Sequence, residues 1–497
     1  MSRLKQLAGQ TAVYGLSSIL ARVFNYFLTP LYTGIFSTES FGIISEMYSY
    51  IAVVLALLTF GMETSLFSFS RNSENKNLVF SSAQSFVTAL SLLFFLIVVV
   101  FSEPIASMLR YPDYPEYVIL FSLIIVLDAL ASVPMAKLRE LNQPLKFALI
   151  NIVNIAFNIG FNIFFLVYCR NQYLESGSNS GWLVNTFYNP HIGVGYVFIS
   201  NIIGSAVKLL LLSGVITIGK FKVNFQLLKQ MLKYASPLAL GAFCFIINEK
   251  TDLLFLKYLL PKSISMQSVG VYSACYKLAM IMTIFIQAFR FAAEPFFFML
   301  EKEKNARQVY ADIMKYFVIF CLGIFLMVTL YIDFFKHFLR REEYWQALQI
   351  VPILLIANLF SGVYQNLSMW YKLSGATKYG MYFSLLGALI TIVFNIILIP
   401  LIGYYGSAWA TFVCYGSMMI VSYFIGQKHY RIPYELKYMF SYTGIALLLY
   451  GVFSIFSYSR LYIEMLVATG LFLTYLGVVL YRERKLFKSI KFIKRKA

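Results

Sequence analysis

The chain has 497 residues, of which 60% are hydrophobic and only 13% are charged, and its net charge is +19. Soluble domains carry about 25% charged residues, so this chain lacks the polar side chains that would cover a soluble surface. A mean hydropathy of +0.72 over the full length also excludes a single membrane anchor on a soluble body. The composition therefore predicts an all-α integral membrane protein.

Apolar stretches of about 20 residues, the length that crosses a bilayer, recur along almost the whole chain. They predict about fourteen transmembrane helices, at residues 9–36, 41–66, 78–102, 115–136, 146–168, 191–216, 234–258, 269–298, 309–332, 345–371, 379–400, 406–427, 439–457 and 461–481. The first is not read as a cleaved signal peptide, because it is too long and contains Arg22.

Positive charges are distributed unevenly between the two sides that these spans define. An even number of spans places both termini on one side, and that side holds 28 of the 41 lysines and arginines, against eight on the other side and five within spans. Because positive charge is retained in the cytoplasm, we expect both termini to be cytoplasmic. The same bias explains the net charge without nucleic acid, and it assigns the basic tail to anionic lipid headgroups.

An internal repeat divides the spans. The segment FGIISEMYSY at 41–50 resembles VGVYSACYKL at 269–278, so that Gly42 and Gly270 coincide at an offset of 228. A second, weaker match begins at Lys137 and Lys372. Six spans separate each pair, and an even number preserves orientation, which predicts two parallel six-helix bundles with a central cleft. The predicted parts are an N-terminal bundle (1–216), a cytoplasmic linker (217–233), a C-terminal bundle (234–427), an accessory helix pair (428–481) and a basic cytoplasmic tail (482–497).

Charged residues inside the spans are the candidate site, because a charge at mid-bilayer costs at least about 2.5–3.5 kcal/mol. Three basic residues are candidates for binding an anionic headgroup, and four acidic residues are candidates for coupling to protons or cations. The basic set is Arg22, Lys250 and Arg290, and the acidic set is Asp128, Glu249, Asp252 and Glu294.

Structural explanations compete with each of these assignments. Arg22 could pair with a carboxylate on a neighbouring helix, and Arg290 and Glu294, at i and i+4, could pair with each other. Glu249, Lys250 and Asp252 could form an interfacial charge cluster. If two bundles pack at a seam, Arg22, Lys250 and Arg290 would meet in one cavity, where arginine can engage an anionic group bidentately.

Other chemistry has little support in the sequence. The five cysteines form no CxxC pair and no metal spacing, and the three histidines are isolated, so we expect no metal and no cofactor. The longest loops have about 20 residues and offer no convincing catalytic constellation, so a membrane-embedded glycosyl or acyl transferase is disfavoured and we expect no enzyme.

Several segments resemble polysaccharide flippases of the O-antigen type. Residues 34–67, 251–298 and the segment NIILIPLIGYYGSAWAT at 395–411 are similar, respectively, to that family's first hairpin, its seventh and eighth spans, and its eleventh and twelfth spans. The resemblance covers nearly the whole chain through the order and spacing of these segments. The larger multidrug/oligosaccharidyl-lipid/polysaccharide exporter superfamily also contains lipid II flippases and cation-coupled drug antiporters.

The resemblance implies a flippase of the bacterial inner membrane that moves undecaprenyl-pyrophosphate-linked oligosaccharide from the cytoplasmic to the periplasmic leaflet by alternating access, for lipopolysaccharide or surface polysaccharide synthesis. It makes the pyrophosphate the headgroup that Arg22, Lys250 and Arg290 would bind. It implies a lipid-linked oligosaccharide and membrane lipids as partners, and a polysaccharide polymerase as a candidate partner. A drug antiporter and a lipid II flippase of the same superfamily stay open as alternatives. The sugar repeat, the coupling ion and the oligomeric state are not specified by the sequence.

Overall fold

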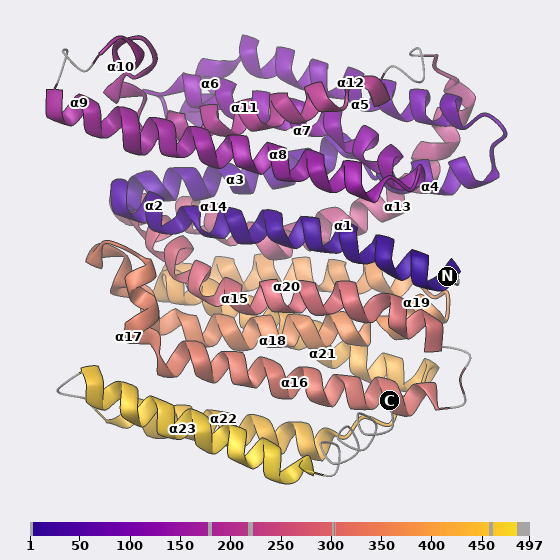
Figure 1. Cartoon of the computed structure of the whole chain (residues 1–497), viewed down its shortest axis with the longest axis vertical. Helices are drawn as coiled ribbons and strands as arrows, with labels where there is room; N and C mark the ends of the chain where they lie inside the picture. The colour runs from indigo at the N-terminus through magenta and orange to yellow at the C-terminus, as the bar shows by residue number, and fades with distance from the viewer. Residues whose placement is uncertain are drawn as a thin grey trace. The chain divides into compact units, whose positions relative to one another are not determined.

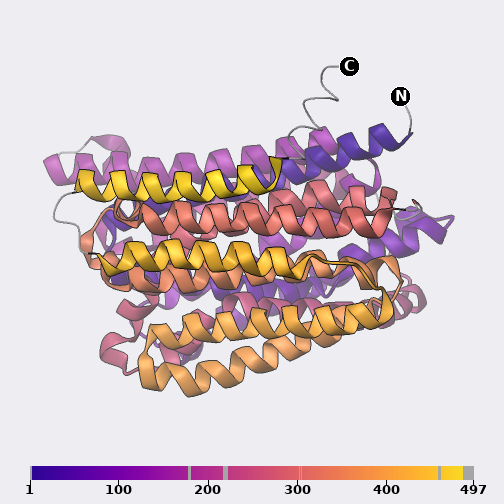
Figure 2. The same ribbon diagram turned by 90° about the horizontal axis from the view of Figure 1, so that it is seen from below.

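The computed structural model describes residues 3–176, 181–216, 222–300, 303, 305–456 and 461–484, and throughout these residues it contains helices and no strands. Residues 217–221 of the predicted linker and residues 485–497 of the predicted tail lie outside the described residues. The chain divides into two units, each of which is described separately below. In both units the long helices run roughly parallel to one another (Figures 1 and 2).

The first unit contains residues 1–273 and 378–407. Its helices are α1 (Arg3–Tyr26), α2 (Leu28–Ile35), α3 (Thr38–Thr59), α4 (Met62–Asn72), α5 (Lys76–Val100), α6 (Ser102–Met108), α7 (Pro115–Glu140), α8 (Pro144–Ile163), η1 (Phe164–Cys169), α9 (Arg170–Ser176), α10 (Trp182–Phe187), η3 (Pro190–Ile192), α11 (Gly195–Leu211), α12 (Ser213–Ile216), α13 (Phe225–Lys250), α14 (Asp252–Leu259), the start of α15 (Lys262–Leu300), α20 (Lys378–Ile402) and the first turn of α21 (Tyr404–His429).

The second unit contains residues 274–377 and 408–497. It holds the rest of α15 and α21, together with α16 (Ala306–Leu330), α17 (Ile332–Phe335), η5 (Lys336–Phe338), η6 (Glu342–Ile350), α18 (Val351–Leu367), α19 (Met369–Leu373), α22 (Leu436–Ile455) and α23 (Leu461–Arg482). Helix α16 packs against α18, α22 and α23. It is 72% buried over its apolar stretch, whereas α23 is 11% buried, so α16 is the centre of this unit and α23 lies at its edge.

Within the described chain, twelve helical segments are long and apolar enough to cross a membrane. The predicted count of fourteen is therefore not confirmed. The two remaining predicted spans correspond to α1, which is not among the twelve, and to α11, which has 17 residues and is at the short end of what a bilayer requires. The protein is a multi-pass, all-helical membrane protein.

Short polar side chains begin several of the long helices. Ser37, Asn75 and Asn224 each accept a hydrogen bond from a backbone N–H in the first turn of α3, α5 and α13. These contacts satisfy donors that the helix itself leaves unpaired. Polar residues at span boundaries thus fix where each apolar stretch begins as a helix.

The first and seventh predicted spans are each broken near one end. The first breaks between α1 and α2 at Phe27, because Pro30 has no N–H to donate to the carbonyl of Tyr26. The seventh breaks at Thr251, between α13 and α14, where the Thr251 hydroxyl donates to the carbonyl of Ile247 at 2.6 Å. The break starts a new helix at Asp252.

The two glycines that the repeat equates face each other. A Cβ atom on Gly270 would lie 1.8 Å from the carbonyl oxygen of Thr38, and one on Gly42 would lie 2.5 Å from the carbonyl oxygen of Met266. Glycine is therefore required at both positions for the backbones of α3 and α15 to approach this closely. The two matching segments of the repeat, 41–50 and 269–278, are thus in contact at these glycines.

Candidate functional site

A narrow cleft in the second unit contains two of the charged residues that the sequence singled out. Arg290 and Glu294 lie one turn apart on α15, and the cleft between α15, α16, α18 and α19 also exposes Lys372 and the amides of Gln365 and Asn366. Its apolar lining consists of Ile286, Phe289, Ala293, Phe297, Phe317, Gly362 and Met369. The free volume is about 10 Å³, about the space of one water.

Arg290 and Glu294 do not neutralise each other. Glu294 accepts a hydrogen bond from the ammonium group of Lys372 at 2.7 Å, while Arg290 donates to the side-chain oxygen of Gln365 at 3.5 Å. The Arg290 side chain is exposed. The cleft therefore holds two cations and one carboxylate, and its net positive charge favours an anionic ligand.

Sequence reasoning missed the contribution of Lys372. The span prediction ended at residue 371, so Lys372 was counted with the cytoplasmic loop. It lies on α19, a short helix that continues from α18 and brings the lysine to the α15 face. The only sequence signal was its place at the start of the weaker repeat match.

The other two basic candidates lie in the first unit. Arg22 is exposed on α1, and Lys250 is the last residue of α13, where it is half-buried beside the half-buried Glu249. Whether Arg22, Lys250 and Arg290 meet in one cavity stays a prediction.

Asp252 belongs to a buried polar cluster at the start of α14. Its two carboxylate oxygens accept hydrogen bonds from the Asn395 amide at 3.2 Å and from the Tyr272 hydroxyl at 3.0 Å. The Ser407 hydroxyl donates to the side-chain oxygen of Asn395 at 2.8 Å, and all four side chains are buried. The Asp252 carboxylate thus accepts hydrogen bonds from side chains on α15 and α20, and Ser407 on α21 in turn orients the Asn395 amide.

The polar surroundings continue one turn back along the seventh span. Asn248 is buried, and its amide lies 3.5 Å from the Thr391 hydroxyl on α20. Carboxylate, amide and hydroxyl oxygens are the ligands that hard cations prefer. Asp252 is thus the one acidic candidate surrounded by a dense set of such groups.

Asp128 is paired within its own unit. Its carboxylate lies 3.4 Å from the ammonium group of Lys208 and accepts a hydrogen bond from the Ser205 hydroxyl at 3.1 Å. Both partners are on α11, which packs along α7. Asp128 is therefore already paired with a cation of the first unit.

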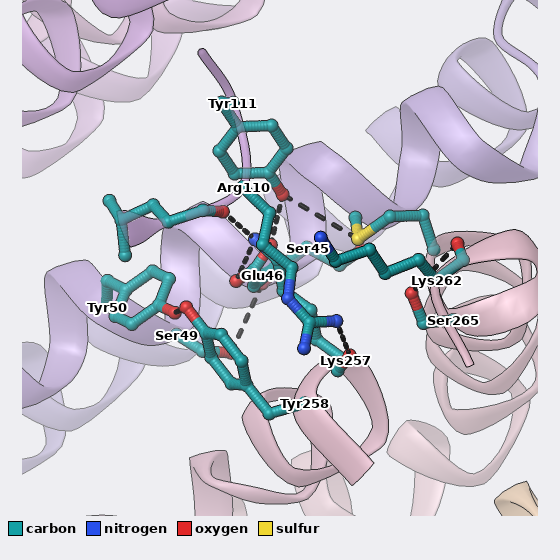
Figure 3. A network of polar contacts seen from close by, with 12 residues as sticks. Ser45, Glu46, Ser49, Tyr50, Arg110, Tyr111, Lys257, Tyr258, Lys262 and Ser265 are labelled. Carbon is teal, nitrogen blue, oxygen red and sulfur yellow. Dashed lines mark hydrogen bonds and ion pairs between the residues drawn. The ribbon is translucent and has the colours of Figure 1, made fainter. Parts of the chain in front are cut away.

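A buried ion pair in the first unit went unnoticed in the sequence. Glu46 on α3 and Lys257 on α14 have side chains that are 0% and 1% exposed, and both carboxylate oxygens lie 2.8 Å from the ammonium nitrogen (Figure 3). Lys257, close to the end of its predicted span, was counted with the outer side, and Glu46 was not singled out.

A larger cavity of about 360 Å³ opens in the second unit between α16, η6, α22 and α23. Asp333 and Glu464 are its acidic lining residues. Burial acts to raise the pKa of Asp333, but hydrogen bonds from Lys336 and Glu464 and the nearby positive charge together hold that pKa below its ordinary value. Asp333 is therefore ionised and already paired.

Two family models match the chain in succession. A model described as "Polysaccharide biosynthesis protein" matches residues 33–173, and the MatE model matches residues 237–397. The two matches fall in the two predicted bundles. No curated protein matches the chain.

Solved structures share the fold over most of the chain. A lipid II flippase, MurJ, in an inward closed conformation has a TM-score of 0.69 at 16% identity, covering 95% of this chain and 99% of that one. An inward-facing multidrug resistance MATE family transporter of the MOP superfamily has a TM-score of 0.64 at 14% identity, covering 84% and 97%. The MATE transporter VcmN of Vibrio cholerae has a TM-score of 0.57 at 14% identity, covering 86% and 95%.

Proposed function

This chain belongs to the multidrug/oligosaccharidyl-lipid/polysaccharide exporter superfamily of membrane transporters, and we propose that it is a flippase for a lipid-linked oligosaccharide. Its substrate is an undecaprenyl-pyrophosphate-linked oligosaccharide unit, which it moves from the cytoplasmic to the periplasmic leaflet of the inner membrane by alternating access. The product serves lipopolysaccharide or surface polysaccharide synthesis, and a polysaccharide polymerase is a candidate partner.

One observation carries this proposal: the cleft on α15 contains two cations against one carboxylate. A pyrophosphate headgroup carries about two or more negative charges, and arginine can hold two of its oxygens at once. A transporter of cationic drugs requires the opposite excess. Because the free volume admits about one water, the cleft widens when the headgroup binds.

The direction of transport agrees with the charge. Both termini are cytoplasmic in the orientation that the positive residues favour, so α15 runs inward and Arg290 lies on its cytoplasmic half. Moving an anion outward across an inside-negative membrane releases about 2.3 kcal/mol per charge per 100 mV. The membrane potential thus assists export.

Cation coupling belongs to Asp252 in this proposal. Its carboxylate, with the side-chain oxygens of Tyr272 and Asn395 close by, offers ligands for a small hard cation once its two protein hydrogen bonds reorganise. Asp252→Asn should remove any dependence of transport on a sodium or proton gradient. Asp128→Asn is the matched control, because Asp128 is already paired with Lys208.

The decisive experiment measures flipping by purified protein in liposomes loaded with a fluorescent undecaprenyl-pyrophosphate oligosaccharide. Arg290→Ala and Arg290→Glu should lower the rate at least tenfold, and Arg290→Lys should retain part of it, because charge is kept while the planar fork is lost. Arg341→Ala is the matched control, since Arg341 pairs with Glu343 outside the cleft. Full activity of Arg290→Glu at normal abundance would refute the cleft as the headgroup site.

The same assay separates the alternatives. A lipid II flippase shares the pyrophosphate headgroup, so it would also depend on Arg290 but would accept lipid II in place of the oligosaccharide substrate. The likeness to MurJ keeps this alternative open. A drug antiporter would transport an organic cation against a gradient and would not depend on Arg290.

A further inference from the structure

The buried ion pair of the first unit forms one side of a larger polar cluster, drawn in Figure 3. The cluster joins four pieces of chain: Glu46 and Tyr50 on α3, Arg110 and Tyr111 in the turn after α6, Lys257 and Tyr258 on α14, and Met266 on α15. Helix α3 belongs to the predicted N-terminal bundle, and α14 and α15 to the predicted C-terminal bundle.

The ammonium group of Lys257 is saturated. It donates to both oxygens of Glu46 at 2.8 Å and to the carbonyl oxygen of Leu109 at 2.5 Å, which accounts for its three protons. It also lies 3.7 Å from the centre of the Tyr111 ring. Lys257 therefore has no free donor left for a ligand.

The turn after α6 is shaped to fit the pair. Arg110 has a φ of 62°, in the left-handed region that costs a residue with a side chain about 1–2 kcal/mol. In this conformation Leu109 presents its carbonyl to Lys257, Tyr111 donates its hydroxyl to Glu46, and Arg110 donates to the carbonyl of Lys257 at 2.8 Å. Burial and the nearby Glu46 carboxylate raise the pKa of Tyr111, which keeps its hydroxyl protonated as a donor.

Stability alone does not account for such a pair. A fully buried ion pair adds little over well-packed apolar residues of the same size, because both charges lose their water. Separating the two charges in a dry site costs much free energy, whereas separating them into water costs almost none. A pair of this kind therefore favours two states, one in which it is dry and closed, and one in which both partners are hydrated.

The ion pair lies next to the close contact between α3 and α15. Gly42 lies one turn before Glu46 on α3, and it is there that α3 and α15 meet backbone to backbone. In the predicted orientation, α3, α14 and α15 all have this end on the outer side of the membrane. At the position that the repeat equates with Glu46, the second copy carries Ala274, so the charge occurs once.

We propose that Glu46, Lys257 and the turn at Leu109–Tyr111 form a latch that closes the outer side and is released in each transport cycle. The latch consists of positioning residues, which touch no substrate. This inference rests on the proposed function, because a flippase must expose its site to each side in turn. When the latch parts, water enters between α3 and α14 and hydrates both charges.

The test uses a cysteine beneath the latch. Ser49 lies one turn from Glu46 on α3 and is 2% exposed, and the five native cysteines of the chain are all buried. In the full chain in liposomes, Ser49→Cys should react slowly with a membrane-impermeant maleimide. Adding Glu46→Gln leaves Lys257 without its counter-ion and should raise the labelling rate at least tenfold.

A matched control makes the same chemical change elsewhere. Lys137 and Glu140 form a pair within α7, at its predicted cytoplasmic end, in which the lysine side chain is 3% exposed. Glu140→Gln should leave the labelling of Ser49→Cys unchanged. Equal labelling of the Glu46→Gln and parent proteins would overturn the latch.

A second variant covers the case in which the single change unfolds the protein. The double change Glu46→Met with Lys257→Met keeps the volume and removes both charges, so the closed form should fold normally. Because methionine gains nothing from water, the latch should stay closed, with slow labelling and transport at least fivefold slower. Normal transport by this variant would refute release of the ion pair.

Labelling requires no lipid-linked substrate, so the two proposals fail separately. If labelling responds as expected but no oligosaccharide is flipped by the parent protein, the latch stands and the proposed substrate is wrong. If flipping occurs and depends on Arg290 while labelling ignores Glu46, the function stands and the latch is wrong.

Discussion

Glu46 and Glu294 each accept a hydrogen bond from a lysine ammonium, at 2.8 and 2.7 Å, in the first and second units respectively. The pair of Glu46 is fully buried and every donor of its lysine is used. The pair of Glu294 is about one-third exposed, with side-chain exposures of 33% for Lys372 and 35% for Glu294, and Arg290 lies beside it. The same two residue types thus close one part of the molecule and leave a positive cleft in another.

Desolvation is the difference between the two pairs. In the buried pair, removing one partner leaves a charge without water and without a counter-ion. In the cleft, water screens both charges, and the pair is worth about 0–1 kcal/mol. Burial therefore decides whether an ion pair holds helices together or stays available to exchange partners with a ligand.

The largest expected effect comes from making the same truncation in both pairs. Glu46→Ala should lower the free energy of unfolding by about 3–5 kcal/mol, because Lys257 stays buried and uncompensated. Glu294→Ala should lower it by less than about 1 kcal/mol. Thermal denaturation of the purified proteins in one detergent measures both, and equal losses would erase the distinction between the two sites.

Close packing beside the latch provides the next test. Gly270→Ala should destabilise the protein by about 1–3 kcal/mol, because the new methyl group would overlap the carbonyl oxygen of Thr38. Gly444→Ala on α22 is the matched control, since nothing lies within 4 Å of its Cβ position. In the control, alanine should be neutral or slightly stabilising. An unaffected melting temperature for Gly270→Ala would show that α3 and α15 do not need their close contact.

A smaller effect is expected for Lys372. Lys372→Gln removes one of the two cations and frees Glu294, so the rate of flipping at low substrate should fall about three- to tenfold, a smaller loss than for Arg290→Ala. Lys315→Gln is the control, because Lys315 pairs with Glu435 and Glu483 in the same unit but outside the cleft. A Lys372 variant that flips as fast as the parent would confine headgroup binding to Arg290.

Substitutions of Arg22 should have the smallest effects, with lysine retaining more activity than alanine. Its side chain is exposed on α1, so Arg22→Lys should keep most of the activity, and Arg22→Ala should reduce surface polysaccharide without loss of protein from the membrane. A complementation assay in a strain without the native gene measures both. Loss of abundance in both variants would favour a structural role.

Hydropathy predicted where the helices lie, often to within a few residues. The predicted span at 379–400 is α20, Lys378–Ile402, and the one at 461–481 is α23, Leu461–Arg482. These boundaries are predictable because membrane thickness fixes the length of an apolar stretch. The interruption near Phe27 was missed although Pro30 signals it, because hydropathy does not register a missing backbone donor.

Residue pairing was much harder to predict. Arg290 and Glu294 were singled out as intramembrane charges that could pair with each other, whereas in the structure Glu294 bonds to Lys372 and Arg290 to Gln365. Glu46 and Lys257 are 211 positions apart, and no local pattern encodes their contact. Periodicity reports which face of one helix is apolar, but it does not report which distant segment covers that face.

Helix α15 runs without a break for 39 residues and carries both Gly270 and Arg290. At 1.5 Å per residue, these two positions are about 30 Å apart along the axis. If α15 tilts as a rigid helix by about 10° at Gly270, Arg290 is displaced by about 5 Å. A small change in the angle of α15 at its contact with α3 therefore gives a displacement at Arg290 that is about as wide as a phosphate group.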